Sequence, residues 1–337
     1  MRVGILTGGG DCPGLNAAIR AAAKRGFQLG WEIIGIEEGW KGLIEKKFEI
    51  LTNETVSGIL HKGGTILGSS RTNPAKIEGG LEKVVNNFKE LKLDALIAIG
   101  GEDTLGVAYK LSKDIPIVGI PKTIDNDAGG TDFCIGFYTA VQTTCEVLDK
   151  LHPTAESHRR VMVVEVMGRH FGWIATYAGL AGGADYILIP EITPDIEGIC
   201  KTIKKRAEYG KNFSLVVVAE GAKIGEEYIT KKAETDAFGH VTLGGAGEIL
   251  AKIIAEKTGA ETRAINLGHF IRGGSPTAFD RILATRFGLK AVELVSKKEF
   301  GKMVSITGNK ITAAPLEKAS EQRAVEKDVY ETAKVFF

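Results

Sequence analysis

Short apolar runs recur along the chain, and most of them end in a glycine-rich or polar cluster. Val3–Leu6, Ala95–Ile99 and Ile115–Ile120 are three such runs in the first third of the sequence. Continuous apolar runs of this length are typical of strands that are buried on both faces of a parallel sheet. The amphipathic stretch Leu105–Lys113 has the spacing of a crossover helix between two of them. We therefore expect an α/β protein with a ligand site at the carboxyl ends of its strands.

The same alternation continues to the C-terminus. We expect further strands at 31–36, 161–166, 186–189, 215–219 and 262–267, with a last strand at 303–307. We expect helices from 15 to about 22 and at 82–92, 137–151, 173–180, 196–208, 246–257, 278–296 and 325–337. The polar, glycine-bearing stretch 223–245 is expected to form a long excursion or hairpin. No stretch has linker composition, so ordered crossovers are expected to join the domains.

Composition narrows the class of protein. The 337 residues have a formal net charge of +1, 44% hydrophobic and 25% charged residues. This balance is ordinary for a soluble enzyme and argues against nucleic-acid binding. No apolar run reaches the ~18 residues of a membrane span, and Met1 leads directly into the first strand, so we expect no signal peptide. The four cysteines are scattered, as in proteins of a reducing compartment: Cys12, Cys134, Cys145 and Cys200. We expect a cytoplasmic protein.

Two glycine-rich loops are candidate phosphate sites. Gly8–Gly14 lies between the first strand and a helix start, where glycine amides and the helix N-terminus attract an anion. The loop fits neither the Walker A pattern nor GxGxxG, so a plain tight turn remains an alternative. Lys62–Pro74 is rich in glycine and hydroxyl residues and contains Arg71, whose planar donor fork matches phosphate. A solvated loop is the alternative there.

Four carboxylates and one ammonium follow two adjacent strands. Glu102 and Asp103 come after the second apolar run, and Lys122 begins the cluster that ends at Asp127 and contains Asp125. The carboxyl ends of neighbouring parallel strands meet at one edge of a sheet. This combination suits a magnesium-phosphate donor and a hydroxyl acceptor better than it suits a protein core.

Eight motifs in order resemble those of the phosphofructokinase family. They are GGGDCPGLN (8–16), GGTILGSSR (63–71), GGEDT (100–104), PKTIDND (121–127), GTDFCIGF (130–137), VEVMGR (164–169), AEG (219–221) and LGHFIRGGSP (267–276). The resemblance implies two doubly wound, three-layer αβα domains with mainly parallel sheets and an active site in the cleft between them. The phosphoryl-donor domain would comprise 1–138 plus 271–318, and the fructose 6-phosphate domain 139–270 plus 319–337.

The resemblance also implies a role for each matching residue. Asp125 would be the general base that takes the proton of the sugar 1-hydroxyl, flanked by Thr123 and Asp127. Glu102 would bind Mg²⁺, with a longer side chain than the Asp more familiar there. The remaining roles fall into three sets. Gly10 and Arg71 would bind the donor; Met167, Gly168, Arg169, Glu220, His269 and Arg272 would bind the sugar phosphate or the transferred phosphoryl group; Arg160 and Arg263 would reach the neighbouring subunit's site in a homodimer or homotetramer.

Two residues bear on the identity of the phosphoryl donor. Family members that use ATP usually have Gly where this chain has Asp103 and Lys122, whereas pyrophosphate-dependent members resemble this chain at both positions. The Asp103 carboxylate would occupy the space of an ATP α-phosphate and repel its charge. Like charges about 4 Å apart cost ~4 kcal/mol at an effective dielectric of 20, or some three decades of affinity. Lys122 would place a cation on pyrophosphate. We therefore expect phosphoryl transfer from pyrophosphate to fructose 6-phosphate.

Three other functions remain open. The chain could be an ATP-dependent 6-phosphofructokinase that tolerates Asp103. Lipid and NAD kinases also have a GGDGT-like turn, but they are expected to lack the sugar-phosphate residues Arg160, Arg169, His269 and Arg272. A non-catalytic sugar-phosphate sensor or scaffold is the third alternative, and the presence of Asp125 argues against it.

Overall fold

The chain forms two compact units in a computed structural model that describes residues 1–224 and 245–337. Unit 1 consists of Met1–Thr139 and Arg272–Arg323, and unit 2 of Ala140–Ile271 and Ala324–Phe337. Among the described residues, no helix has the length and apolar character that crossing a membrane requires. The excursion expected at 223–245 lies, except for its ends, outside the described residues.

Unit 1 is built on a seven-stranded sheet with the order β11-β10-β5-β4-β1-β2-β3. The strands are β1 (Arg2–Thr7), β2 (Glu32–Ile36), β3 (Phe48–Leu51), β4 (Ala95–Gly100), β5 (Ile117–Pro121), β10 (Lys302–Thr307) and β11 (Lys310–Pro315). The five central strands are parallel, and the two edge strands β3 and β11 are antiparallel to their neighbours. The carboxyl ends of β1, β4 and β5 therefore lie side by side at one edge.

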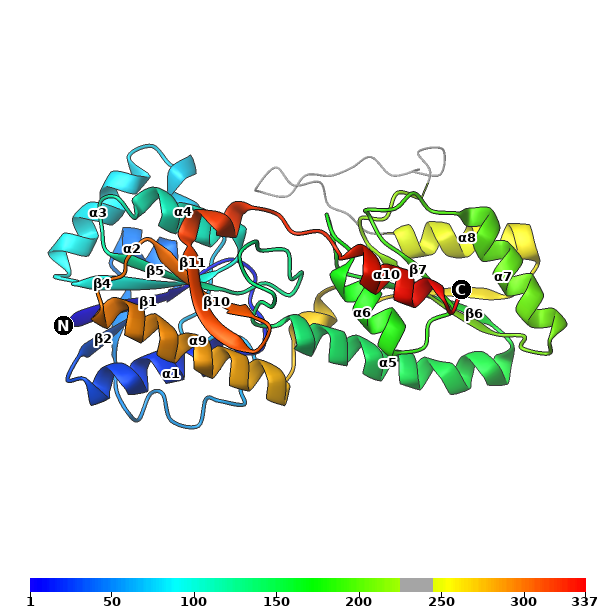
Figure 1. Cartoon of the computed structure of the whole chain (residues 1–337), viewed down its shortest axis with the longest axis horizontal. Coiled ribbons are helices and arrows are strands. Elements are labelled where there is room, and N and C mark those ends of the chain that lie inside the picture. Colours follow the sequence, from blue (N-terminus) through cyan, green and yellow to red (C-terminus); the bar gives the residue numbers. More distant parts are fainter. Residues whose placement is uncertain (225–244) are drawn as a thin grey trace. The chain divides into compact units, whose positions relative to one another are not determined.

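Helices cover both faces of this sheet (Figure 1). On one face α1 (Leu15–Gln28) packs against α9 (Ala278–Ser296). Gly288 permits this approach, because a Cβ there would lie 2.6 Å from the backbone oxygen of Ala18. On the other face, α2 (Trp40–Glu45), α3 (Gly80–Glu90) and α4 (Glu102–Leu111) share one apolar core with the strands.

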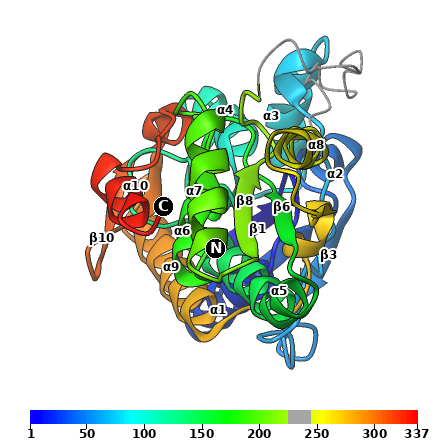
Figure 2. The ribbon, with the colours of Figure 1, turned by 90° about the vertical axis from the view of Figure 1, so that its right-hand side faces the viewer.

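Unit 2 has a smaller, fully parallel sheet with the order β7-β8-β6-β9. Its central strands β8 and β6 lie side by side in Figure 2. Its strands are β6 (Val161–Val166), β7 (Tyr186–Leu188), β8 (Ser214–Ala219) and β9 (Thr262–Asn266). The helices α7 (Ile196–Glu208) and α8 (Ala246–Thr258) share a core with one face. The helix α6 (Trp173–Ala181) packs on β7 and β8 and contacts α5 (Phe137–His158) and α10 (Lys327–Lys334).

The predicted fold class, two three-layer αβα domains with mainly parallel sheets, is confirmed. The prediction that 303–307 is the last strand is wrong, because β11 follows it. Gly308, at a φ of 58°, begins a two-residue Gly-Asn hairpin turn, for which positive φ is required. Helix α5 was expected to end near 151 but continues through Pro153 to His158, since Leu148 and Ala155 on either side of the proline are fully buried.

Candidate active site

The glycine loop after β1 is held against its neighbours by backbone contacts. Gly8 donates its amide to the Ile99 oxygen at 2.9 Å, and Gly9 donates to the Ser70 oxygen at 3.0 Å. A Cβ at Gly8 would lie 2.5 Å from the Thr104 Oγ1 atom, and a Cβ at Gly10 would lie 2.6 Å from a terminal nitrogen of Arg272. Thr104 therefore requires glycine at position 8, whereas at Gly10 the end of the flexible Arg272 side chain could shift.

The loop that precedes Arg71 forms one wall of this glycine loop. Ser69 Oγ donates to the Gly9 oxygen at 2.5 Å, and Thr7 Oγ1 donates to the Gly68 oxygen at 2.8 Å. Asn16, at the start of α1, accepts from the Ile66 amide at 2.8 Å through its side chain. These contacts fix the loop up to Ser70, and Arg71 follows as an exposed side chain.

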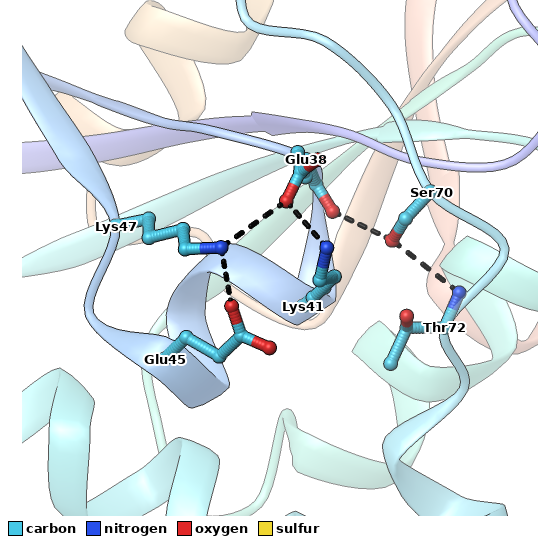
Figure 3. A network of polar contacts seen from close by, with 6 residues as sticks. All are labelled: Glu38, Lys41, Glu45, Lys47, Ser70 and Thr72. Atoms are coloured by element: carbon cyan, nitrogen blue, oxygen red, sulfur yellow. Dashed lines mark hydrogen bonds and ion pairs between the residues drawn. The ribbon is translucent and has the colours of Figure 1, made fainter.

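A polar network lies behind the same loop (Figure 3). Ser70 Oγ donates to the Glu38 backbone oxygen at 2.6 Å. The Glu38 carboxylate pairs with Lys41 at 2.8 Å and with Lys47 at 3.7 Å. The hydrogen bond from Lys41 is the main reason that the pKa of Glu38 lies below its usual value. Exposed ion pairs stabilise little, so the loop depends mainly on the contact of Ser70 with the backbone.

Lys122 lies beneath the glycine loop. Its side chain is buried, and Nζ donates to the backbone oxygens of Gly8 at 3.1 Å and Gly10 at 2.5 Å. Burial lowers the pKa of this ammonium, and the nearby Arg272 lowers it further. A buried ammonium needs such acceptors. Lys122 and Gly10, both predicted to bind the phosphoryl donor, are therefore in direct contact.

Arg272 belongs to unit 1 and lies against the same loop. Its Nη1 donates to the backbone oxygen of Asp11 at 3.2 Å. Its Nε is buried without a hydrogen-bond partner among the described residues. Two cations, Arg272 and Lys122, therefore face the glycine loop and make it a suitable place for a highly charged anion.

The predicted carboxylates lie at the ends of β4 and β5. Glu102 and Asp103 are exposed in the first turn of α4, where the helix dipole favours negative charge. Thr123 Oγ1 accepts from the Asp125 amide at 3.2 Å. Burial, together with the charges of Asp125 and Glu102, raises the pKa of Asp127 to about 6. The three carboxylates are therefore close enough to repel one another.

Asn126 fixes the two aspartates that flank it. It is fully buried, with a left-handed φ of 52° that Asn tolerates better than most residues. Its side-chain amide donates to the Asp132 oxygen at 3.2 Å, and its oxygen accepts from the Cys134 amide at 2.9 Å. Sequence reasoning missed this residue, although an Asn between two Asp residues was a usable signal for a turn with positive φ.

The last residues of unit 1 form further hydrogen bonds to the loop after β5 and to Glu102. The Arg323 backbone amide donates to the backbone oxygen of Asp127 at 2.9 Å. The Arg323 guanidinium donates to the backbone oxygens of Thr131 and Asp132, both at 2.6 Å. Gln322 Nε2 donates to a carboxylate oxygen of Glu102 at 3.3 Å. These residues are remote in sequence from the motifs, and no sequence pattern indicated their role.

The acidic residues fit a magnesium-phosphate group. Among residues 1–224 and 245–337, no cluster of three or more His, Cys, Asp or Glu side chains could hold a metal by itself. Mg²⁺ usually needs only one or two carboxylates beside phosphate oxygens and water. Burial is the main reason that the pKa of Asp127 is raised, and the charges of Asp125 and Glu102 add to the effect. A cation bound nearby would relieve the repulsion between these carboxylates. The donor set therefore suits Mg²⁺ bound together with a phosphate ligand.

In unit 2, the predicted sugar-phosphate residues divide between the two ends of the sheet. Met167, Gly168 and Arg169 follow β6, Glu220 follows β8, and His269 follows β9. The Glu220 amide donates to the Val166 oxygen at 2.8 Å, and the Gly221 amide to the Gly168 oxygen at 3.1 Å. The loops after β6 and β8 are thus in contact. The structure brings these residues together at the carboxyl edge.

Arg160 and Arg263 lie at the opposite, amino edge of the same sheet. Arg160 directly precedes β6, and Arg263 is the second residue of β9. The six residues of β6 span about 16 Å at ~3.3 Å per residue. Both arginines bind Glu261, from Arg160 Nη2 at 2.8 Å and from Arg263 Nη2 at 2.6 Å. Within one chain, these arginines are therefore separated from Met167 and its neighbours.

The cysteines provide no redox site among the described residues. All four are free thiols, and Cys145 alone is partly exposed. Cys12 lies in the glycine loop, where its Sγ donates to the Ile135 oxygen at 3.4 Å. Burial raises the pKa of Cys12 to about 12. It therefore stays a protonated, small apolar side chain.

Comparison with known proteins gives consistent matches over the whole chain. A family model described as phosphofructokinase matches residues 2–295. A pyrophosphate--fructose 6-phosphate 1-phosphotransferase of Amycolatopsis methanolica is 55% identical over 100% of both chains. An ATP-dependent 6-phosphofructokinase of Streptomyces coelicolor is 49% identical over 95% of each. The structure of phosphofructokinase from Saccharomyces cerevisiae is similar with a TM-score of 0.82 and 32% identity, covering 99% of this chain and 46% of that longer one.

Proposed function

The chain belongs to the phosphofructokinase family, and from this premise we propose that it transfers a phosphoryl group from pyrophosphate to the 1-hydroxyl of fructose 6-phosphate. The products are fructose 1,6-bisphosphate and phosphate, and the reaction is reversible. The observation that carries the choice of donor is the buried Lys122, bonded to the oxygens of Gly8 and Gly10. Together with Asp103 at the neighbouring strand end, it supports a compact, highly charged donor over a nucleotide.

Asp125 is the general base of this reaction. A carboxylate oxygen of Asp125 accepts the proton of the sugar 1-hydroxyl while the hydroxyl oxygen of the sugar attacks the phosphoryl group. This proton transfer contributes about 10²–10⁴-fold to the rate. Thr123 and Asp127 orient the hydroxyl. Asn126 and Arg323 act through the backbone, because their contacts hold both aspartates in place.

Lys122 and the glycine loop bind the donor in unit 1. The Lys122 ammonium stabilises negative charge on pyrophosphate, while the Gly10 backbone and Arg71 bind its outer oxygens. Glu102, oriented by Gln322, would hold Mg²⁺ together with donor oxygens. When bound, Mg²⁺ neutralises charge that develops on the phosphate groups.

The sugar phosphate is bound mainly by residues of unit 2. Met167, Gly168, Glu220 and His269 contact its hydroxyls, and Arg169 stabilises the transferred phosphoryl group. Arg272 was assigned to the sugar phosphate from its motif. Its place against Asp11 in unit 1 also suits it to neutralise charge next to the glycine loop. The four free thiols support a reducing, cytoplasmic location.

Arg160 and Arg263 serve the site of a second copy of the chain. Their position at the amino edge of the sheet, about one strand length from Met167, supports a homodimer or homotetramer that completes each site across an interface. The 6-phosphate of the sugar is the ligand for this pair.

We expect two inactive variants to restore each other's activity when they assemble together. Asp125→Asn removes the base but keeps Arg263, and Arg160→Ala with Arg263→Ala keeps the base. A mixed oligomer then contains one site with both functions intact. Co-expression with two affinity tags, followed by assay at low fructose 6-phosphate, measures the recovery. Equal inactivity of the mixed and unmixed oligomers would show that the arginines serve the site of their own chain.

A donor assay tests the proposed function. Purified protein with fructose 6-phosphate and Mg²⁺ is given either pyrophosphate or ATP, and kcat/KM is measured for each. We expect pyrophosphate to be preferred by at least a hundredfold. Faster turnover with ATP would instead identify an ATP-dependent 6-phosphofructokinase, as the relative from Streptomyces coelicolor is named. Binding of fructose 6-phosphate without turnover would indicate a sensor.

A further inference from the structure

One carboxylate occupies both arginines that are assigned to the 6-phosphate. Glu261 Oε1 lies 2.8 Å from Arg160 Nη2 and 2.6 Å from Arg263 Nη2. The arrangement follows from the sheet. Val161 pairs with Thr262 on the neighbouring parallel strand, and the Val161 amide donates to the Glu261 oxygen at 2.9 Å. The residues before β6 and β9 are therefore held side by side.

The arginine pair is only partly satisfied by this carboxylate. Arg263 also donates from Nη1 to the Thr262 oxygen at 3.1 Å. The Nε of Arg160, by contrast, is buried and has no hydrogen-bond partner among the described residues. Anions commonly bind an arginine through two parallel N–H groups. An anion that binds Arg160 through Nε and Nη2 must therefore compete with Glu261 for the Nη2 group.

The net charge of Glu261 and the two arginines favours replacement of the carboxylate by a phosphate. Glu261 is ionised, because the hydrogen bond from Arg160 holds the pKa of Glu261 below its usual value. One carboxylate between two guanidiniums leaves a net charge of +1, and without it the pair would present +2. The Glu261 side chain is 46% exposed, and exposed ion pairs are weak. A phosphate dianion can therefore displace this carboxylate, which can then move into water.

We propose that Glu261 is an internal competitor of the sugar 6-phosphate: its carboxylate occupies Arg160 and Arg263 in the empty site and is displaced when the substrate binds. It keeps the two like-charged side chains together at the cost of affinity, and so it sets the concentration range in which fructose 6-phosphate binds. This inference rests on the proposed function, because it takes the two arginines as ligands of that phosphate.

Glu261→Gln tests the inference because it keeps the side-chain length and one acceptor oxygen but removes the charge. An exposed ion pair typically shifts an equilibrium by about 1.5- to 5-fold, and two pairs are involved. We therefore expect KM for fructose 6-phosphate to fall about three- to tenfold, with kcat and KM for pyrophosphate changed less than twofold. The dissociation constant of fructose 6-phosphate, measured by calorimetry without the donor, should fall by the same factor.

Glu197→Gln is the matched control. Glu197 pairs with Lys257 at 2.6 Å in the same unit, so its loss removes an exposed ion pair without touching the arginines, and we expect unchanged kinetics. A merely structural carboxylate would not give tighter binding when removed.

The outcomes separate the two proposals. A wild-type protein without activity on fructose 6-phosphate would refute the proposed function. An active wild type with an unchanged or raised KM in Glu261→Gln would overturn the competitor role alone. Glu261→Ala, checked by thermal unfolding, is the second variant. Failure of both variants to fold would also overturn the inference, since Glu261 would then be required to hold the two strands together.

Discussion

Asp125→Asn is expected to lower kcat by about two to four orders of magnitude, the usual contribution of a positioned general base. Asparagine has nearly the same shape but cannot accept the proton of the sugar hydroxyl. The contacts of Asn126 and Arg323 hold the loop through other atoms, so we expect KM for fructose 6-phosphate to change less than threefold. Initial rates with pyrophosphate give both constants.

Asp114→Asn is a suitable control for this substitution, because Asp114 is an exposed acid just before β5. It should leave both constants unchanged. If Asp125→Asn retained more than a tenth of the wild-type kcat, another group would have to take the proton.

The same substitution should alter stability in a direction fixed by Asp127. Burial and the charge of Asp125 raise the pKa of Asp127 to about 6. In the unfolded chain it titrates near 3.9, so the folded state favours the neutral form. The free energy of unfolding of the wild type therefore falls as pH rises through about 6. Without the Asp125 charge this loss is smaller.

Asp125→Asn should thus match the wild type in stability near pH 5 and exceed it near pH 8. Urea unfolding of the protein without metal or substrate at both pH values measures the difference. If the difference in unfolding free energy between Asp125→Asn and the wild type were the same at pH 5 and pH 8, the charges of Asp125 and Asp127 would not be coupled. This test also establishes that the inactive variant is folded.

Replacing Asp103 and Lys122 together by Gly should reduce kcat/KM for pyrophosphate at least a hundredfold. Removing the ammonium deletes a charge directed at the donor, which is worth about 10²–10³-fold for one preorganised stabilising group. It also leaves the oxygens of Gly8 and Gly10 without their buried donor, which costs about 1–3 kcal/mol per group. We expect the glycine loop to become less ordered and ATP to be accepted better than by the wild type.

Asp103→Asn separates charge from space as the reason for excluding ATP. If repulsion dominates, this variant should gain affinity for ATP while pyrophosphate turnover falls little. If bulk dominates, only Asp103→Gly should gain it. Wild-type kinetics with pyrophosphate in the double variant would refute both donor roles.

Local sequence features predicted the strands other than β3 and β11, most helices and the residues at the strand ends. Apolar runs such as 95–99 and 161–166 identify buried strands, because a strand covered on both faces cannot alternate polar and apolar residues. Glycine and charged clusters after these runs then mark the ligand-binding edge. The hairpin of β10 and β11 was missed, since the half-exposed β11 lacks a continuous apolar run.

The sequence thus determined which chemical groups the candidate site contains, and only the tertiary structure determined which remote residues hold them in place. The order and residue types of the motifs predicted the fold class and the candidate site residues, because each motif is short and its function depends on adjacent residues. Only the folded chain placed Arg323 against Asp127, Gln322 against Glu102, and Glu261 between Arg160 and Arg263. Those contacts join residues up to 220 positions apart, and no local pattern encodes a contact that the packing of remote elements creates.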